Sequence, residues 1–245
     1  MLTKLFRKLV ESRGLRLSDE REAPAGFEMF LRQCRARGLR VDNVIDVGVG
    51  HGTPWLYEAF PEEQLFLFEP LSEFEGVAEA LVRSRGAKYM PVALGEEAGT
   101  ATISVAQATP TSSTLLQATA ELSEALSREG RSAGFTSREI PVETLDGYAE
   151  RIVGSNVLKI DAEGFELGIL KGGRRVLAEC HLLILEISLI PRYEGEATLK
   201  DLLAFLEEEG FALYEIIELS RRRADAPTTF MDVAFVPAQS ALRFL

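Results

Sequence analysis

The stretch Val44-Ile-Asp-Val-Gly-Val-Gly-His-Gly52 constrains the fold more than any other part of the chain. Residues 44–47 form a short apolar run typical of a buried strand, and glycines follow it at every second position. Glycine is needed where a backbone turns sharply and comes close to a ligand. Thr53 can cap a helix after this turn, and Trp55, Leu56 and Phe60 give that helix an apolar face. A strand, a glycine-rich turn and a helix in this order indicate an α/β domain that binds a nucleotide-like ligand.

An acidic residue at the end of a second strand supports this interpretation. Residues 65–68 are apolar and lead directly to Glu69. In a doubly wound sheet both turns open onto the same crevice, and an acid at the second strand's tip can bind the two hydroxyls of a ribose. We therefore expect a nucleoside-containing cofactor. The alternative, a glycine turn without a ligand, does not explain why turn and acid occur together.

The spacing of the glycines selects among such cofactors. The dinucleotide fingerprint is G-x-G-x-x-G, whereas this loop reads G-x-G-x-G, with Asp46 two residues before the first glycine. An acid beside the loop favours a cationic ligand over a diphosphate. S-adenosylmethionine carries an ammonium and a sulfonium and has no phosphate. We therefore expect a methyltransferase rather than a nicotinamide-dependent reductase, which would also need a Tyr-x-x-x-Lys pair that the chain lacks.

Length and composition exclude several other classes. The 245 residues fit one large domain with a short appendage. The net charge of −11 argues against a general nucleic-acid binder, because phosphate neutralisation needs a basic face. Cys34 and Cys180 lie far apart, and neither they nor the two histidines show zinc-ligand spacing. We expect buried thiols, a cytoplasmic protein and no metal, and we find no run near the roughly 20 apolar residues of a membrane span.

Residues 1–40 are expected to form a helical extension, and residues 41–245 the catalytic domain. Apolar residues recur at helical spacing near the N-terminus, with basic residues between them: Leu2, Leu5, Phe6 and Leu9, with Lys4, Arg7 and Lys8. This helix is expected to dock on the domain or at a homodimer interface. Contact with an anionic membrane surface or a lipid-linked substrate is the alternative.

From residue 44 onward, predicted strands and helices alternate, as in a parallel sheet that is covered on both faces. The strands are expected at 44–48, 65–69, 88–93, 100–106, 137–142, 156–160, 181–187, 211–217 and 229–236, and the helices at 72–85, 117–129, 165–170 and 199–208. The segment 107–135 leaves the sheet and is expected to form a lid or substrate wall. The fold class is therefore Rossmann-like α/β, a mostly parallel doubly wound sheet with an antiparallel closing strand.

A second motif, Lys159-Ile-Asp-Ala-Glu-Gly-Phe-Glu166, follows the strand at 156–160. Asp161 is then at the strand's carboxyl tip, above the crevice. Clustered Lys159, Asp161 and Glu163 could orient a substrate and remove a proton from it. In the alternative, Asp161 caps the next helix and Glu163 pairs with Lys159.

Together these motifs resemble the FkbM-type family of S-adenosylmethionine-dependent methyltransferases. The resemblance covers about residues 44–236 and rests on the order of several short motifs: Val44-Ile-Asp-Val-Gly48, Phe68-Glu-Pro70, Val92-Ala-Leu-Gly95, Ser112-Ser113, Val142-Glu-Thr-Leu-Asp146, Leu158-Lys-Ile-Asp-Ala-Glu-Gly-Phe-Glu166, Leu170-Lys-Gly172, Glu186 and Asp232-Val-Ala-Phe235. The family often reads D-V-G-A-N-x-G where this chain has Gly50 in place of asparagine. The resemblance implies the class I methyltransferase fold and O-methylation of a hydroxyl on a sugar, glycolipid or natural product.

These expectations assign roles to individual residues. Cofactor binding is expected of Asp46, Gly48, Gly50, Gly52, Glu69, Ala93 and Asp161. Catalytic roles are expected of Asp161, Glu163, His51 and Glu186, and the last three are the general-base candidates. Each has a structural alternative: His51 as an exposed loop residue, and Glu186 as a core charge paired with a lysine or arginine.

Further expectations concern variants, metal and partners. Asp46→Ala and Glu69→Ala should each weaken cofactor binding without unfolding the chain. Metal independence is expected because no third carboxylate follows Asp161 and Glu163 at close spacing. The acceptor should be a small molecule or carbohydrate, with no nucleic-acid partner. Arg221-Arg-Arg223 is either a solvated turn or a docking point for an acidic group of the acceptor. A non-catalytic nucleoside-binding or scaffold module of the same fold is the alternative function.

Overall fold

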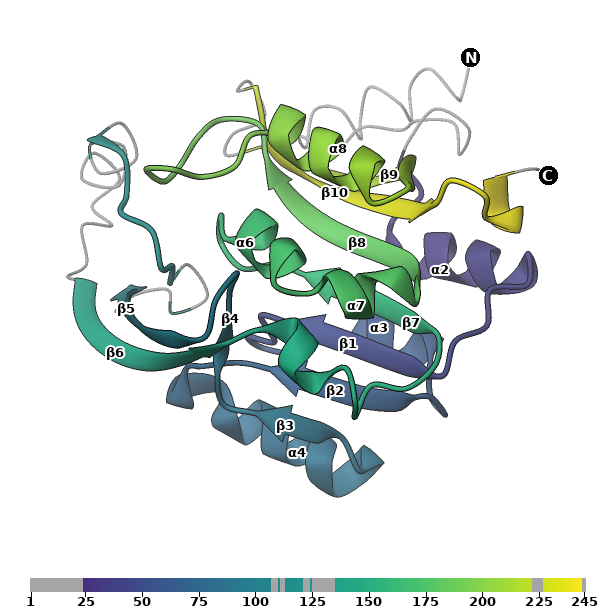
Figure 1. The fold of residues 1–245 in the computed structure, drawn as a ribbon, viewed down its shortest axis with the longest axis horizontal. Helices are drawn as coiled ribbons and strands as arrows, with labels where there is room; N and C mark the ends of the chain where they lie inside the picture. Colours follow the sequence, from purple (N-terminus) through teal and green to yellow (C-terminus); the bar gives the residue numbers. More distant parts are fainter. Residues whose placement is uncertain are drawn as a thin grey trace, which may run out of the picture.

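The computed structural model describes residues 24–106, 110, 113–120, 124, 135–221 and 227–243. Strands and helices alternate along most of this length, as the sequence predicts (Figure 1). The strands are β1 (Asn43–Val47), β2 (Gln64–Phe68), β3 (Lys88–Met90), β4 (Ala93–Leu94), β5 (Gly99–Ala106), β6 (Phe135–Glu143), β7 (Asn156–Ile160), β8 (Cys180–Ser188), β9 (Phe211–Arg221) and β10 (Thr228–Pro237). The helices are α2 (Phe27–Ala36), α3 (Pro54–Ala59), α4 (Glu75–Arg85), α6 (Glu166–Lys171), α7 (Arg174–Ala178) and α8 (Leu199–Glu208), with 3-10 turns η1 (Ser72–Phe74), η3 (Leu145–Tyr148) and η4 (Ala241–Arg243).

Seven strands form the main sheet in the order β3-β2-β1-β7-β8-β10-β9. The first five are parallel to one another, whereas β10 runs antiparallel to both of its neighbours, β8 and β9. This arrangement confirms the predicted mostly parallel Rossmann-like sheet. The antiparallel strand, however, lies inside the sheet, and β9 forms the edge.

The segment expected as one strand at 88–93 contributes to two sheets. β3 extends the edge of the main sheet beside β2, and after Pro91 the chain turns into β4. β4 belongs to a second sheet of order β4-β6-β5, whose long antiparallel pair is β5 and β6. The helix expected near 117–129 lies largely outside the described residues. The excursion between β4 and η3 is therefore built on a sheet of its own.

Two hydrophobic cores cover the two faces of the main sheet, which makes it doubly wound. Alternate residues of each strand point to opposite faces, so neighbours in sequence enter different cores. Ile45 and Leu158 pack with α6, α7 and α8 on one face, and Val44 and Val157 pack with α2, α3 and α4 on the other. Figure 1 shows α6 and α7 in front of the sheet and α3 behind it.

α2 is part of the domain rather than of a separate extension. Its residues Phe30, Leu31 and Cys34 are buried in the same core as Val44. The expected boundary between residues 40 and 41 therefore does not separate this helix from the fold. The basic amphipathic segment before residue 24 lies outside the described residues. None of the described helices is long and apolar enough to cross a membrane.

The register of the central strands brings their ends level. Val47 pairs with Phe68 of β2 on one side and with Ile160 of β7 on the other. The residues that follow these strands, Gly48, Glu69 and Asp161, therefore emerge side by side at one edge of the sheet.

Candidate active site

A cavity of about 320 Å³ opens at this edge of the sheet. Its lining combines the predicted site residues with apolar side chains from both sheets. The expected residues that line it are Gly48, Gly50, His51, Gly52, Glu69, Ala93, Asp161, Glu163 and Glu186, and the apolar ones include Phe68, Leu71, Phe74, Val92, Leu94, Phe165 and Ile169. A mostly apolar pocket with a few converging polar groups is the usual form of a small-molecule site. The structure therefore brings nearly all the predicted residues together, Asp46 excepted.

The glycine loop is pressed against the end of β7, and only glycine fits at its start. A Cβ atom at Gly48 would lie 1.9 Å from the main-chain oxygen of Asp161, and the φ angle there is +76°. Gly50 and Gly52 also have positive φ angles, +50° and +93°. A φ near +50° is the left-handed region, which asparagine tolerates better than other side chains do. Glycine and asparagine both adopt the left-handed conformation readily, so Gly50 can replace the asparagine that is usual in the family at this position.

Glu69 joins the glycine loop to the loop after β2. Its Oε2 accepts a hydrogen bond from the main-chain nitrogen of Gly50 at 3.0 Å, and its Oε1 accepts one from Leu71 at 2.9 Å. The side chain is buried, and burial raises the pKa of its carboxyl group. Each carboxylate oxygen can accept a further hydrogen bond. Glu69 is thus fixed in orientation and can still accept bonds from the hydroxyls of a ribose.

Asp46 lies beneath the loop and does not line the cavity. Its Oδ2 accepts hydrogen bonds from the hydroxyls of Thr53, at 2.8 Å, and Tyr57, at 2.5 Å. Its Oδ1 meets Lys159 Nζ at 3.2 Å as an ion pair without a well-aligned hydrogen bond. The side chain is fully buried, so the expected contact with the cofactor is replaced by a supporting role.

Lys159 connects the buried carboxylate of Asp46 to the glycine loop. Its ammonium group donates to the main-chain oxygen of Gly48 at 2.7 Å and lies 3.6 Å from Asp161 Oδ2. Burial alone would lower the pKa of Lys159, but the carboxylates of Asp46 and Asp161 outweigh burial and raise it. Lys159 therefore stays charged and holds the tips of β1 and β7 together.

Three carboxylates converge at the wall of the cavity. Asp161, Glu163 and Glu186 can each place a ligand oxygen within 4.8 Å of the other two. Glu186 comes from β8, so the sequence argument that no third carboxylate lies close to Asp161 and Glu163 is wrong. It failed because the adjacent parallel strand, not the same segment, supplies the residue. Metal independence remains a prediction, but it can no longer rest on the absence of a third carboxylate.

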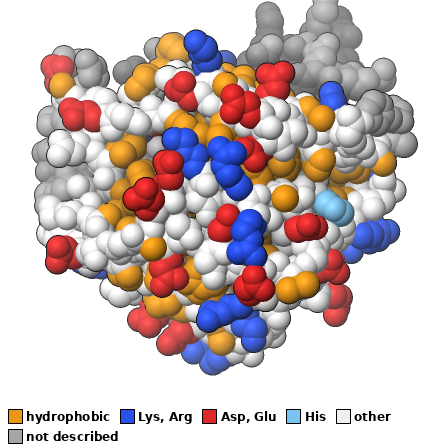
Figure 2. All heavy atoms as spheres, in the orientation of Figure 1, with side chains coloured by type: hydrophobic (Ala, Val, Ile, Leu, Met, Phe, Trp, Pro, Cys, Tyr) orange, Lys and Arg blue, Asp and Glu red, His pale blue; other side chains and the backbone are white. Residues whose placement is uncertain are grey.

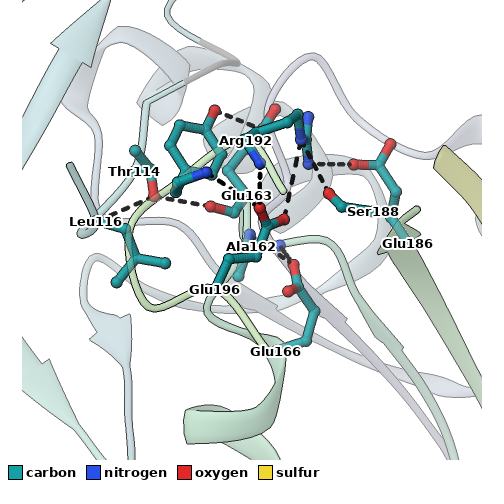
Figure 3. Close-up of polar contacts among 11 residues, drawn as sticks. Thr114, Leu116, Ala162, Glu163, Glu166, Glu186, Ser188, Arg192 and Glu196 are labelled. Atoms are coloured by element: carbon teal, nitrogen blue, oxygen red, sulfur yellow. Dashed lines mark hydrogen bonds and ion pairs between the residues drawn. The ribbon is translucent and has the colours of Figure 1, made fainter. Parts of the chain in front are cut away.

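Glu163 is held by its backbone as well as by its side chain. Its φ angle of +50° makes it the one described residue other than glycine in the left-handed region. The main-chain oxygen of Glu163 accepts a hydrogen bond from Thr114 Oγ1 at 2.7 Å, and its Oε2 accepts one from Tyr193 at 3.1 Å (Figure 3). Burial raises the pKa of Glu163 to about 7, although Arg192 opposes the shift. A carboxyl group with this pKa is suited to proton transfer near neutral pH.

The cavity wall beyond Glu163 is also acidic. Burial and the neighbouring carboxylates of Asp161 and Glu163 raise the pKa of Glu186. Asp232, on β10, lines the same cavity, and burial followed by repulsion from Asp161 raises its pKa to about 7. These groups crowd negative charge into one side of the cavity, and only part of it is neutralised by arginine and lysine.

Glu166 has a structural role in the same motif. Its Oε1 accepts hydrogen bonds from the main-chain nitrogens of Ala162, at 2.9 Å, and Gly164, at 3.2 Å (Figure 3). The side chain is buried, and burial raises its pKa to about 7. Glu166 thereby shapes the turn that presents Asp161 and Glu163 to the cavity.

The excursion of the chain between β5 and β6 closes part of the cavity. Pro110, Ser113, Thr114 and Leu115 line it, and contact of this segment with the substrate remains a prediction. Ser113 Oγ donates a hydrogen bond to the main-chain oxygen of Pro110 and accepts one from the main-chain nitrogen of Ala106. The hydroxyl of Ser113 therefore stabilises the local backbone. Ser112 lies outside the described residues.

His51 is exposed, lines the cavity and packs edge-on against Phe74, with ring centroids 5.1 Å apart.

Three residues of the site were not predicted from the sequence to belong to it. Phe27 and Trp55 stack with ring centroids 3.9 Å apart and line the cavity from α2 and α3. Arg192 lies behind Glu163 and Glu186 and contacts both. None of these three residues lies in a sequence motif that would mark it as part of the site. The only signal for Arg192 is that a buried Glu186 needs a basic partner, and the sequence does not say which one.

The family model of the methyltransferase FkbM domain matches residues 46–213, which include the glycine loop, Glu69 and the three converging carboxylates. The chain belongs to the FkbM methyltransferase family. Its cofactor is therefore S-adenosylmethionine, as the sequence predicts. A search among curated protein sequences finds no significant match.

Solved structures resemble the chain only distantly. A magnesium protoporphyrin IX methyltransferase from Synechocystis PCC 6803, with bound SAM, is 11% identical over 86% of this chain and 77% of its own, with a TM-score of 0.43. An S-adenosylmethionine-dependent methyltransferase from Clostridium acetobutylicum is 10% identical over 96% of this chain and 97% of its own, with a TM-score of 0.45.

The residues of the cavity fit S-adenosylmethionine. This cofactor carries a sulfonium, an ammonium and a carboxylate and is therefore cationic overall. The ionisable side chains that line the cavity are Glu69, Asp161, Glu163, Glu186 and Asp232 on the acidic side, with Lys159 and His51. An excess of carboxylates attracts a cation, and the glycine loop leaves the backbone accessible beside Asp161. Glu69 could accept hydrogen bonds from the ribose, and Leu71, Phe74 and Val92 would offer apolar surface to the adenine.

Proposed function

We propose that the protein is an O-methyltransferase that transfers the methyl group of S-adenosylmethionine to a hydroxyl of a sugar, glycolipid or natural product. The observation that carries the proposal is the convergence of Asp161, Glu163 and Glu186 at the wall of the cofactor cavity. Methyl transfer to a hydroxyl needs alignment of the acceptor and a base for its proton, and little else from the protein. A cluster of carboxylates beside the glycine loop meets both needs.

Bound cofactor supplies an electrophilic methyl group on sulfur. In our proposal, Asp161 and Glu186 accept hydrogen bonds from hydroxyls of the acceptor and so orient its reactive oxygen. Glu163 would take the proton of the acceptor hydroxyl as that oxygen receives the methyl group. The fixed geometry that Tyr193 and Arg192 give Glu163 supports it for this role over the exposed His51, and its pKa of about 7 suits proton transfer.

The charge of the cavity supports an acceptor without an acidic group near its reactive hydroxyl. Asp161, Glu163, Glu186 and Asp232 all line the cavity. A phosphate or carboxylate about 4 Å from an ionised member of this group would be repelled by about 4 kcal/mol at an effective dielectric constant of about 20. Neutral polyols and amine-bearing polyols avoid this repulsion, and carboxylates accept hydrogen bonds from their hydroxyls.

A nucleic-acid partner is not expected. The net charge of −11 opposes phosphate binding. Acidic and basic side chains are interspersed on the face that carries α6 and α7 (Figure 2). We keep a small-molecule or carbohydrate acceptor as the proposed partner.

Two experiments test the proposal. Calorimetric titration with S-adenosylmethionine should give a single site, and an absence of heat would favour a scaffold without cofactor. A panel of hydroxylated acceptors is then screened by mass spectrometry for a gain of one methyl group. With the acceptor identified, Glu163→Gln should lower kcat by roughly 10²- to 10⁴-fold and leave cofactor affinity nearly unchanged. Equal activity in Glu163→Gln and the wild type would exclude Glu163 as the base and shift the role to Glu186 or His51.

A further inference from the structure

Arg192 occupies the centre of the polar network behind the cavity (Figure 3). It follows β8, and its guanidinium reaches Glu163 Oε2 at 2.9 Å and Glu186 Oε2 at 3.3 Å. Its Nε donates to Ser188 Oγ at 2.9 Å. The side chain is 16% exposed and is absent from the residues that line the cavity. The guanidinium is therefore an internal charge, separated from the acceptor by the carboxylates that it contacts.

Those carboxylates have the geometry of ligands for a divalent cation. Asp161, Glu163 and Glu186 can bring one oxygen each within 4.8 Å of one another. Hard divalent cations such as Mg²⁺ and Mn²⁺ prefer carboxylate oxygens in such groups. Two of these three side chains, Glu163 and Glu186, are already bridged by the guanidinium of Arg192.

We propose that Arg192 is the built-in cation of this carboxylate group and keeps it free of divalent metal. The inference concerns which cation the group holds, so it goes beyond methyl transfer and does not depend on the acceptor. An arginine cannot lose its charge in a protein, so this positive charge does not exchange with solvent as an ion does.

The surroundings of Arg192 fix it in place. Its guanidinium lies 5.3 Å from the ring centre of Tyr193 and 5.6 Å from that of Phe230, at distances typical of cation–π contacts. Glu196 accepts a hydrogen bond from the main-chain nitrogen of Arg192 at 2.7 Å, which holds the backbone at this residue. Glu163 and Glu186 also raise the pKa of Arg192 more than burial lowers it. Arg192 is therefore a positioning residue, which fixes the carboxylate of Glu163.

Removal of the guanidinium of Arg192 should allow Asp161, Glu163 and Glu186 to bind a divalent metal ion. The experiment compares Mn²⁺ binding by wild-type protein and Arg192→Met, measured by the loss of the free-ion signal in electron paramagnetic resonance. Methionine keeps much of the volume and apolar contact of arginine but not its charge. We expect Arg192→Met to bind one Mn²⁺ at least about tenfold more tightly than the wild type, because Glu163 and Glu186 lose their arginine partner and become available, with Asp161, as metal ligands. Arg192→Lys should remain close to the wild type because it keeps a positive charge.

Two further variants locate the effect. Adding Glu186→Gln to Arg192→Met should abolish the gained Mn²⁺ site, because it removes one of the three carboxylates. Arg174→Met is a matched control, since Arg174 also pairs with a glutamate, Glu209, and lies 4.9 Å from the ring centre of Phe205. That variant should bind Mn²⁺ no better than the wild type.

The outcomes separate the alternatives. Equal Mn²⁺ affinity in Arg192→Met and wild type would overturn the proposal. Tight binding by the wild type that is lost in Glu163→Gln would overturn it too, because the carboxylates would then hold metal beside arginine. If Arg192→Met unfolds without ions, Mn²⁺ should restore its cooperative thermal transition, and failure to do so would also count against the proposal. None of these readouts uses methyl transfer, so a failure of the proposed reaction remains distinguishable.

Discussion

Gly50 donates its main-chain N–H to the carboxylate of Glu69 across 3.0 Å and so links the loop after β1 to the tip of β2. The same carboxylate accepts from Leu71 with its other oxygen. One side chain thus sets the distance between the glycine loop and the loop after β2, both of which are expected to bind the cofactor.

Loss of this carboxylate should weaken cofactor binding. We expect Glu69→Ala to lower the affinity for S-adenosylmethionine by roughly ten- to a hundredfold, because it removes charge-assisted hydrogen bonds to the ribose. Calorimetry measures the affinity, and circular dichroism checks the fold. The control is Glu73→Ala, which removes an exposed carboxylate paired with Arg138 on the neighbouring 3-10 turn. Similar affinities in the two variants would remove Glu69 from the cofactor site.

The glycine loop should tolerate only side chains that accept a left-handed backbone. We expect Gly50→Asn to bind S-adenosylmethionine within a few-fold of the wild type, since asparagine adopts a φ of +50° at small cost. Gly50→Val should bind far more weakly, because a β-branched residue is strained there. Gly48→Ala should also lose binding, since its Cβ would overlap the oxygen of Asp161. Equal binding by the asparagine and valine variants would contradict this account.

Asp46 should matter for stability before it matters for binding. The expectation from sequence was that Asp46→Ala leaves the fold intact, but the structure buries Asp46 against Lys159. Removing one partner of a buried ion pair leaves an uncompensated charge, so we expect a loss of about 3–5 kcal/mol in the free energy of unfolding. Urea denaturation measures it. The double variant Asp46→Ala/Lys159→Met should recover part of the loss, and no recovery would mean that the pair is not the cause.

The unfolding free energy should fall as the pH rises from about 4 to about 7. Asp232, Glu163 and Glu166 all have a pKa raised to about 7 by burial, so the folded state binds more protons than the unfolded chain in this window. The contribution of these protonated groups to stability is complete below the pKa that they have in the unfolded chain. It is lost as the pH rises through the pKa of about 7 that they have in the folded protein.

Asp232→Asn tests this dependence. The variant should flatten the slope of unfolding free energy against pH by an amount on the order of a few kcal/mol across the window. Denaturant titrations at pH 5, 6, 7 and 8 measure it. Asp201→Asn is the control, because its exposed carboxyl group has a lowered pKa and changes stability only in more acidic solution. An unchanged slope in Asp232→Asn would show that Asp232 is not raised in the folded state.

The turn between the last two strands remains a candidate for acceptor docking. Arg221 ends β9, and its partner Thr228 begins β10, two residues before Phe230, which pairs with Ser188 at the carboxyl end of β8. Arg221 therefore lies at the edge of the sheet that carries the cavity, whereas Arg222 and Arg223 lie outside the described residues. Replacing residues 221–223 with glutamine should raise the KM of an acceptor that carries a remote acidic group and leave cofactor affinity unchanged.

A matched control for the arginine turn removes the same charge elsewhere. Arg83, Arg175 and Lys200 are exposed, and their triple glutamine variant should leave acceptor KM unchanged. If the turn is only solvated, both triple variants will behave alike, and the acceptor site is then to be sought along residues 107–135.

The parallel sheet and its crevice were predictable because they follow from local patterns. The apolar run before Gly48 and the acid after residue 68 each report on their own strand, and parallel strands place their carboxyl ends together. The lateral contacts were not predictable in this way. That Glu186 comes within reach of Asp161 depends on strand order, and that Asp46 faces Lys159 depends on the register of β1 against β7. The sequence also did not indicate that Arg192 returns from beyond β8 to bridge two of the carboxylates.

The position of β10 bears on how the chain can be synthesised and assembled. This strand is the last of the described strands but lies between β8 and β9, so β8 has no partner on one side until residue 237 has been made. An unpaired apolar strand such as β8 is a site for association with other chains. A chain that stops before β10 also lacks Asp232 in the cavity. Completion of the sheet and completion of the cavity therefore depend on the same late segment, and shortened products of translation should neither bind the cofactor nor remain dispersed.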